Sequence, residues 1–129
     1  MKAKINDESA NMGVLKYAHH WHAQWKETLR AAVLTGESID TTIIQRDDCC
    51  ELGKWLYGDG QKLYWGKQEF HDLLICHREF HLLVGAVAEV INGQQYELAT
   101  TYLGNDSPFS KSSREVTMAI ERLELAVAV

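Results

Sequence analysis

Residues 67–93, KQEFHDLLICHREFHLLVGAVAEVING, decide the fold. Apolar residues recur along this stretch at steps of three and four, the spacing that places them on one face of an α-helix. The residues that share this face are Phe70, Leu73, Leu74, His77, Phe80, His81, Val84 and Ala88. Asn92 and Gly93 then supply a helix-ending signal. The pattern predicts one long helix over residues 67–91, with two histidines on its buried side.

The same periodicity predicts a long helix on either side of this stretch. Upstream, a helix over residues 7–34 would end at Gly36 and bury one stripe, made of Leu15, Ala18, His22, Trp25, Leu29 and Val33. Downstream, Ser107 is placed to cap a last helix, with Pro108 at its first position. The buried stripe of this last helix would be Val116, Ile120, Leu123 and Val127.

Two shorter helices complete the predicted secondary structure. Asp47 or Asp48 could cap one over residues 49–57, which the glycines at 58 and 60 would end, and another would cover residues 94–103. No strand or internal repeat is predicted. The fold class is therefore all-α, an antiparallel four-helix bundle with an additional short helix, and residues 1–129 form a single domain around one core.

Composition narrows the classes of function. The 13 basic and 18 acidic residues give a net charge of −5, which disfavours a surface that tracks nucleic acid phosphates. No stretch approaches the roughly 20 apolar residues of a membrane span, and the polar, acidic start differs from a secretion signal. Three cysteines cannot all pair, which suits a reducing compartment, so a cytoplasmic protein is expected. The start at Met1 favours a complete small protein or an N-terminal domain.

His77 and His81 stand four residues apart on the buried face of the central helix. At that separation, two imidazoles project side by side and can bind one metal ion. Imidazoles in an apolar interior are costly unless they are hydrogen-bonded or bound to something. The pair is therefore either a hydrogen-bonded core feature or half of a metal site.

Two further side chains complete a set of metal donors. His22 lies on the buried stripe of the first helix, and Cys50 follows the expected cap of the short helix, whose dipole should favour its thiolate form. Three imidazoles and one thiolate suit tetrahedral Zn²⁺ and argue against calcium or magnesium. Gly53 would let a neighbouring helix approach the metal, and Trp55 is expected to anchor the packing beside it.

Three short motifs occur in a fixed order along the chain. They are His22-Ala23-Gln24-Trp25, Cys50-Glu51-Leu52-Gly53-Lys54-Trp55 and His77-Arg78-Glu79-Phe80-His81, separated by 24 and 21 residues. Together they resemble the H-x-x-W, C-x-L-G-x-W and H-x-x-x-H signature of the chemoreceptor zinc-binding (CZB) domain family. The similarity, to which Arg46-Asp47 and Ser107-Pro108-Phe109 contribute, spans residues 18–123.

The resemblance implies a cytosolic helical bundle, often dimeric, that binds one zinc ion through His22, Cys50, His77 and His81. Domains of this family are regulatory, are attached to or work with chemotaxis receptors and diguanylate cyclases, and in some cases respond to zinc or hypochlorous acid. By the same resemblance, the chain is expected to form a homodimer, to control a signalling partner and to have no enzyme activity.

Other chemistry-bearing side chains receive plainer interpretations. His19 lies almost on the same face as His22 and is the credible substitute ligand. Cys49 departs from the family pattern and points about 100° away from Cys50, which makes it a bystander, a redox partner or a minor competing ligand. Cys76 is interpreted as a small buried hydrophobe. The remaining assignments are solvated side chains for His20 and His71, and packing instead of a ligand cage for Trp21, Trp25, Trp55 and Trp65.

Two functions fit this donor set. In one, Cys50 leaves the metal when zinc is scarce or when an oxidant attacks its sulfur, and the short helix moves. In the other, zinc only staples the helices together. Hydrolysis is disfavoured because four protein ligands leave no open position, and a di-iron site is disfavoured because no Glu-x-x-His occurs. Because the histidines must be neutral to bind, metal release is expected through about pH 6.

Overall fold

The structure is a computed structural model that describes residues 2–128, with side chains described from residue 13 onward. Over this range every regular element is a helix, which confirms the all-α prediction. The helices are α1 (Lys2–Thr35), α2 (Thr41–Ile44), α3 (Glu51–Leu56), α4 (Asp59–Tyr64), α5 (Gln68–Asn92), α6 (Tyr96–Tyr102) and α7 (Pro108–Val127). Between residues 2 and 128, no helix combines the length and apolarity needed to cross a membrane.

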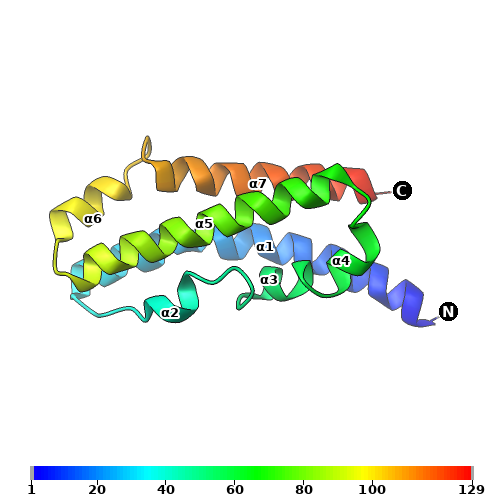
Figure 1. The fold of residues 1–129 in the computed structure, drawn as a ribbon, viewed down its shortest axis with the longest axis horizontal. Helices are drawn as coiled ribbons and strands as arrows, with labels where there is room; N and C mark the ends of the chain where they lie inside the picture. Colours follow the sequence, from blue (N-terminus) through cyan, green and yellow to red (C-terminus); the bar gives the residue numbers. More distant parts are fainter. Residues whose placement is uncertain (1, 129) are drawn as a thin grey trace.

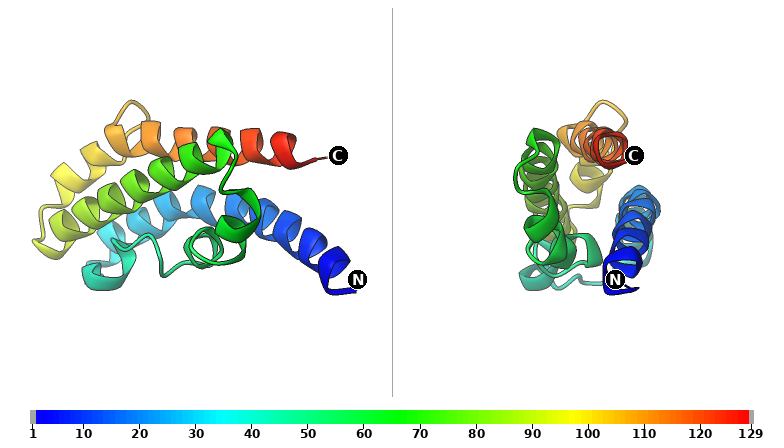
Figure 2. Two further views of the ribbon diagram at one scale, coloured as in Figure 1. Left: turned by 45° about the vertical axis from the view of Figure 1, so that its right-hand side comes forward. Right: turned by 90° about the vertical axis from the view of Figure 1, so that its right-hand side faces the viewer.

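The helices form four roughly parallel rods. Figure 1 shows α1 and α5 running in one direction along the long axis and α7 running back. Between the end of α1 and the start of α5, the chain returns through α2, α3 and α4, so the second rod is broken into three short helices. The end-on view in Figure 2 places α1 and α5 at diagonal corners, with α7 and the broken rod at the other two. Side chains from α1 and α5 therefore face each other across the centre.

The predicted stripes account for most of the core. Buried side chains come from all the long helices and from α3, among them Leu15, Ala18, Leu29, Leu52, Leu56, Phe70, Leu73, Phe80, Val84, Ala88, Val116, Ile120 and Leu123. Trp25, Val33, Leu74 and Val127 were expected in this set, and they are only partly buried against its edge. The prediction that Trp55 is a packing anchor is confirmed by its 6% exposure.

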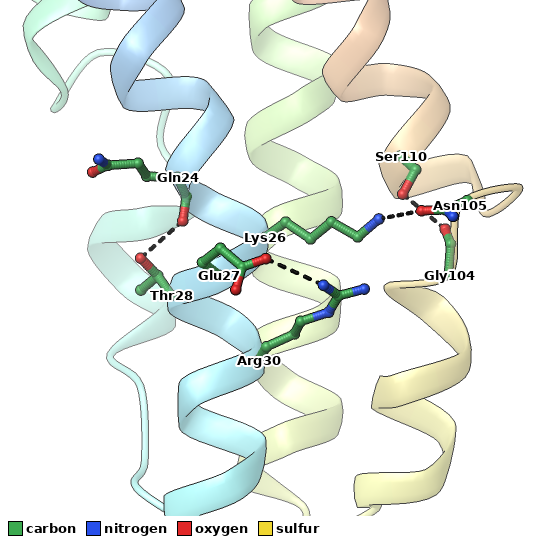
Figure 3. Close-up of polar contacts among 8 residues, drawn as sticks. All are labelled: Gln24, Lys26, Glu27, Thr28, Arg30, Gly104, Asn105 and Ser110. Atoms are coloured by element: carbon green, nitrogen blue, oxygen red, sulfur yellow. Dashed lines mark hydrogen bonds and ion pairs between the residues drawn. The ribbon is translucent and has the colours of Figure 1, made fainter.

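The ends of the long helices follow the predicted signals. Gly36 adopts a φ of 72°, a conformation that glycine tolerates best, and its N–H donates to the carbonyl of Ala32 at 2.9 Å. Ser107 caps α7 by accepting a hydrogen bond from the N–H of Ser110 at 3.2 Å. Figure 3 shows this end held against α1, where Lys26 donates to the side chain of Asn105 at 2.9 Å.

One prediction about the broken rod is wrong, and one of its helices was not predicted. Neither Asp47 nor Asp48 caps the short helix α3, because its N-cap is Cys50 itself, whose sulfur accepts the N–H of Gly53. The helix does end as expected, with Tyr57 as its C-cap just before Gly58, but the chain then enters the unpredicted helix α4 at Asp59. Close packing accounts for the glycine inside α4, because a Cβ on Gly60 would lie 2.7 Å from the ring of Trp55.

Candidate metal centre

His77 and His81 project side by side from α5 into the centre of the bundle. Their side chains are 0% and 1% exposed, and their ring centroids lie 4.5 Å apart at an angle of 71°. This is the arrangement expected for residues one helical turn apart on a buried face. The apolar stripe of α5 therefore carries both imidazoles to the place where the diagonal helices meet.

His22 approaches the pair from α1, on the opposite diagonal corner. Its ring centroid lies 5.1 Å from that of His77 and 5.9 Å from that of His81. The Nδ1–H of His22 donates to the carbonyl of Ala18 at 3.0 Å, and Nε2 is buried with no hydrogen-bond partner in the described part of the chain. This tautomer leaves a lone pair on Nε2 with nothing to bind, and such a buried atom is costly unless a ligand satisfies it.

Cys50 reaches the three histidines from the break between α2 and α3. Its sulfur lies 3.2 Å from Nε2 of His77 and 3.5 Å from Nε2 of His81. One ligand atom from each of the four residues lies within 4.8 Å of the other three. Three stretches of chain far apart in the sequence thus place four soft or borderline donors around one point.

The donor set fits a tetrahedral zinc ion. Zinc bonds of about 2.0 Å to nitrogen and about 2.3 Å to sulfur place tetrahedral ligands about 3.6 Å apart, close to the two separations that involve Cys50. A thiolate with three imidazoles suits zinc and not the oxygen-preferring calcium or magnesium. The unpartnered Nε2 of His22 is the atom that such an ion would satisfy.

Backbone carbonyls orient two of the three imidazoles. Nδ1 of His81 donates to the carbonyl of Ile44 at 2.8 Å, at the end of α2, as Nδ1 of His22 does to Ala18. Such bonds fix the ring and direct Nε2 toward a metal. Nδ1 of His77 is also buried, and it has no partner among the described residues. His77 therefore has no carbonyl to orient its ring, which is held by packing against His22 and His81 and by the contact of its Nε2 with the Cys50 sulfur.

The loop before α3 is held in place by Asp47. A Cβ on Gly53 would lie 1.9 Å from the backbone oxygen of Asp47, so only glycine allows this approach. The hydroxyl of Tyr57 donates to the Asp47 carboxylate. Burial, and to a smaller extent this contact, raises the pKa of Tyr57 to about 12. Gly53 was expected to admit a neighbouring helix, but it admits the loop that delivers Cys50.

Burial keeps the imidazoles in the neutral form that binds metal. Removal from water lowers the pKa of His22 to about 4, against the opposing effect of its bond to Ala18. The same cause, with the neighbouring imidazoles, lowers the pKa of His77 to about 2. The pKa of His81 is also lowered by burial, although the bond to Ile44 acts in the other direction.

The thiol of Cys50 behaves differently from the prediction. We expected the start of a helix to lower its pKa, and the N–H groups of Gly53 and Leu52 do act in that direction. Burial outweighs them and raises the Cys50 pKa. Without a metal, the buried sulfur is therefore a thiol, and binding of an ion would have to displace its proton.

The other candidate residues lie away from this cluster. His19, the substitute ligand, forms a 2.7 Å contact with Glu124 of α7, and His20 is exposed beside Gln24. His71 is half-buried against Trp65 instead of solvated. Trp21 and Trp65 are 56% and 54% exposed, so neither is a core side chain, although the ring of Trp65 packs against Phe70 and His71. All three cysteines are half-buried, and Cys76, which was expected to be a buried hydrophobe, packs against the edge of the core.

The sequence motifs did not reveal two parts of the site. The carbonyls of Ala18 and Ile44 orient imidazoles, and backbone atoms leave no residue-type signal in a sequence. The contact between Asp47 and Gly53 was indicated only in part. The glycine one turn after Cys50 pointed to a close approach, but the sequence did not show that Asp47 makes it.

Comparison with known proteins agrees with the geometry. The family model described as chemoreceptor zinc-binding domain matches residues 22–88, a range that begins at His22 and includes the other three residues of the cluster. Neither the curated proteins nor the solved structures contain a significant match to the chain. The match covers just over half of the 129 residues, and the chain belongs to the chemoreceptor zinc-binding domain family.

Proposed function

We propose that this chain binds one zinc ion through His22, Cys50, His77 and His81 and that the state of this site controls a signalling partner. The observation that carries the proposal is the convergence of the four ligand atoms within 4.8 Å in the centre of the bundle. Membership of a zinc-binding family supports zinc as the metal. The unpartnered Nε2 of His22 supports a bound ion over a hydrogen-bonded core cluster.

A regulatory role is a better fit than a catalytic one. When bound, zinc would link the four side chains into one closed tetrahedral unit, with no open position for a water or a substrate. The protein side of the site serves this purpose: burial keeps the imidazoles neutral, and the carbonyls of Ala18 and Ile44 hold two of them in orientation. The proposed function is therefore binding that is coupled to conformation.

Cys50 couples the site to the rest of the molecule. Its sulfur contacts His77 and His81 and also accepts the N–H of Gly53 at the start of α3. A ligand that is also an N-cap links occupancy of the site to the stability of the helix that follows. Loss of zinc, or oxidation of the sulfur, would therefore release the first turn of α3 from the bundle.

The partner and the assembly are part of the same proposal. We place the chain in the cytoplasm, as a homodimer that acts on a signalling partner such as a chemotaxis receptor or a diguanylate cyclase. Exposed apolar side chains two turns apart support a surface for a second chain: Ile75 and Leu82 on α5, and Met118 and Leu125 on α7.

The alternative function is a zinc ion that only staples the helices. Hydrogen exchange of the α3 amides, measured while free zinc is buffered over a range of concentrations, separates the two. Sensing predicts that exchange from Leu52 to Leu56 accelerates as zinc is withdrawn, while the core amides of α5 stay protected. Loss of protection throughout the bundle at the same zinc concentration would support the staple, because the whole fold would then depend on the metal.

A further inference from the structure

A cavity of about 610 Å³ opens beside the metal centre, between the middle of α1 (residues 13–25) and the start of α3. Its wall is mostly apolar and includes the half-exposed rings of Tyr17 and Trp21. His22 and Cys50 line the same cavity, so two of the proposed ligands border a space that small molecules can enter. Cys49 also lines it. Two cysteines that are neighbours in the sequence therefore line the cavity, and only one of them belongs to the cluster.

Nothing in the proposed zinc site uses Cys49. It lies outside the group of four donors, and it is only half-buried, so it is not a core side chain. Its thiol donates to the carboxylate of Asp48 at 3.5 Å. This neighbour is itself held by Arg46 at 3.0 Å, which keeps the Cys49 side chain at the surface of the loop.

We propose that Cys49 is the resolving thiol of the site and forms a reversible disulfide with Cys50 when a peroxide enters the cavity. The inference rests on the proposed function for the role of Cys50 in zinc binding. The pairing itself rests only on the adjacency of the two cysteines in the sequence and on the cavity that both of them line.

The reaction needs one peroxide for each disulfide. The Cys50 thiolate attacks an oxygen of hydrogen peroxide, the O–O bond breaks, and hydroxide leaves, so that the sulfur loses two electrons and becomes a sulfenic acid. The Cys49 sulfur then attacks the Cys50 sulfur, and the S–O bond breaks. The oxygen leaves as water, with the proton of the Cys49 thiol. Overall, two thiols and one peroxide give one disulfide and two waters.

Pairing with Cys49 would end the role of Cys50 as a zinc ligand. The thiolate is the form that binds metal, and a disulfide sulfur carries no negative charge to place beside His77 and His81. The bond would also be easily reduced. Adjacent Cα atoms are about 3.8 Å apart, closer than the usual separation in disulfides, and such strain raises the reduction potential. The pair would protect Cys50 from irreversible oxidation and return it to the site on reduction.

Peptide mass measurement tests the pairing directly. The zinc-loaded protein is treated with hydrogen peroxide, its free thiols are alkylated, and trypsin then cuts after Arg46 and Lys54 to release residues 47–54 with both sulfurs. We expect this peptide to be unalkylated and lighter by two hydrogens than the reduced peptide. Dithiothreitol should return the peptide to its reduced mass and restore the full zinc content of the protein. The matched control is Cys76→Ser, which removes a half-buried thiol elsewhere and should change nothing.

The variant Cys49→Ser separates this proposal from simple oxidation of Cys50. We expect its 47–54 peptide to gain two oxygens, as a sulfinic acid, and zinc binding to be lost for good after reduction. Recovery of zinc by Cys49→Ser equal to that of the wild type would overturn the proposal. So would a wild-type disulfide between two chains, seen on a non-reducing gel. Absence of zinc before oxidation would count against the proposed function alone, because the disulfide can be measured on the metal-free protein as well.

Discussion

The backbone oxygen of Asp47 occupies the space in which Gly53 would carry a Cβ, only 1.9 Å from that position. The contact holds the loop before α3 against the first turn of that helix, where Cys50 accepts the N–H of Gly53. The missing side chain therefore sets the position of a sulfur three residues away, and with it the geometry of the cluster.

Gly53→Ala should damage both the fold and the metal site. The added methyl would push Asp47 away, and overpacking of this kind lowers the free energy of unfolding by about 1–3 kcal/mol. Zinc affinity should fall with it, because the loop carries Cys50. Thermal unfolding and a zinc titration check this. The matched control is Gly13→Ala, where a Cβ meets nothing within 4 Å and helix propensity should add roughly 0.5–1 kcal/mol. Equal behaviour of the two variants would contradict the role assigned to the loop.

His19 and His22 are three residues apart, and only the second should bind metal. His22→Ala removes one of the four donors and should abolish stoichiometric zinc binding. His19→Ala should leave the zinc content unchanged, because His19 contacts Glu124 on α7 and lies outside the cluster. The zinc content of both purified variants decides the matter. If His19→Ala lost zinc and His22→Ala kept it, the ligand would be His19 and the assignment of His22 would be wrong.

Acid should destabilise the metal-free protein from about pH 6.5 downward. In the fold, burial lowers the pKa of His22 to about 4 and that of His77 to about 2, whereas both are near 6.5 in the unfolded chain. Between these values the unfolded chain binds more protons, so stability falls as pH falls. The melting temperature of metal-free protein from pH 8 to pH 5 measures this. A melting temperature that stays constant or rises over that interval would be inconsistent with neutral buried histidines.

The proposed homodimer should depend on the exposed apolar positions of α5. Leu82→Glu places a charge on a 56% exposed leucine, where it should leave the fold intact but weaken association with a second chain. Leu34→Glu is the control, because Leu34 is 87% exposed near the end of α1. Sedimentation velocity of the wild type and both variants tests this. A wild type that sediments as a monomer, or a Leu82→Glu dimer as stable as the wild type, would argue against this surface.

The sequence predicted the long helices well because their signals are local. The apolar stripe of α5 carries His77 and His81 inward, and Ser107 with Pro108 marks the start of α7 as expected. The four clustered residues were also named from the sequence, from the buried faces of the predicted helices and from the resemblance of three motifs to a family signature.

The broken rod was harder to predict because its form depends on tertiary contacts. Asp47 and Asp48 have the residue type of a helix cap, but packing of the loop against Gly53 leaves Cys50 as the cap. α4 begins at a glycine pair that normally ends a helix. Residue 60 is glycine because the ring of Trp55 occupies the space that a Cβ would need. Packing contacts within the folded loop decide these points, and the hydrophobic periodicity of the sequence does not record them.

The most direct test of the account is the zinc content of the purified protein beside that of Cys50→Ser, followed by competition with a coloured zinc chelator. The account predicts about one zinc per chain in the wild type. It predicts an affinity lower by more than the 10–100-fold typical of a lost orienting contact in Cys50→Ser, because a direct ligand is removed. Cys76→Ser should match the wild type. Absence of zinc from the wild type, or equal affinity in Cys50→Ser, would contradict the account and leave the four side chains as core packing.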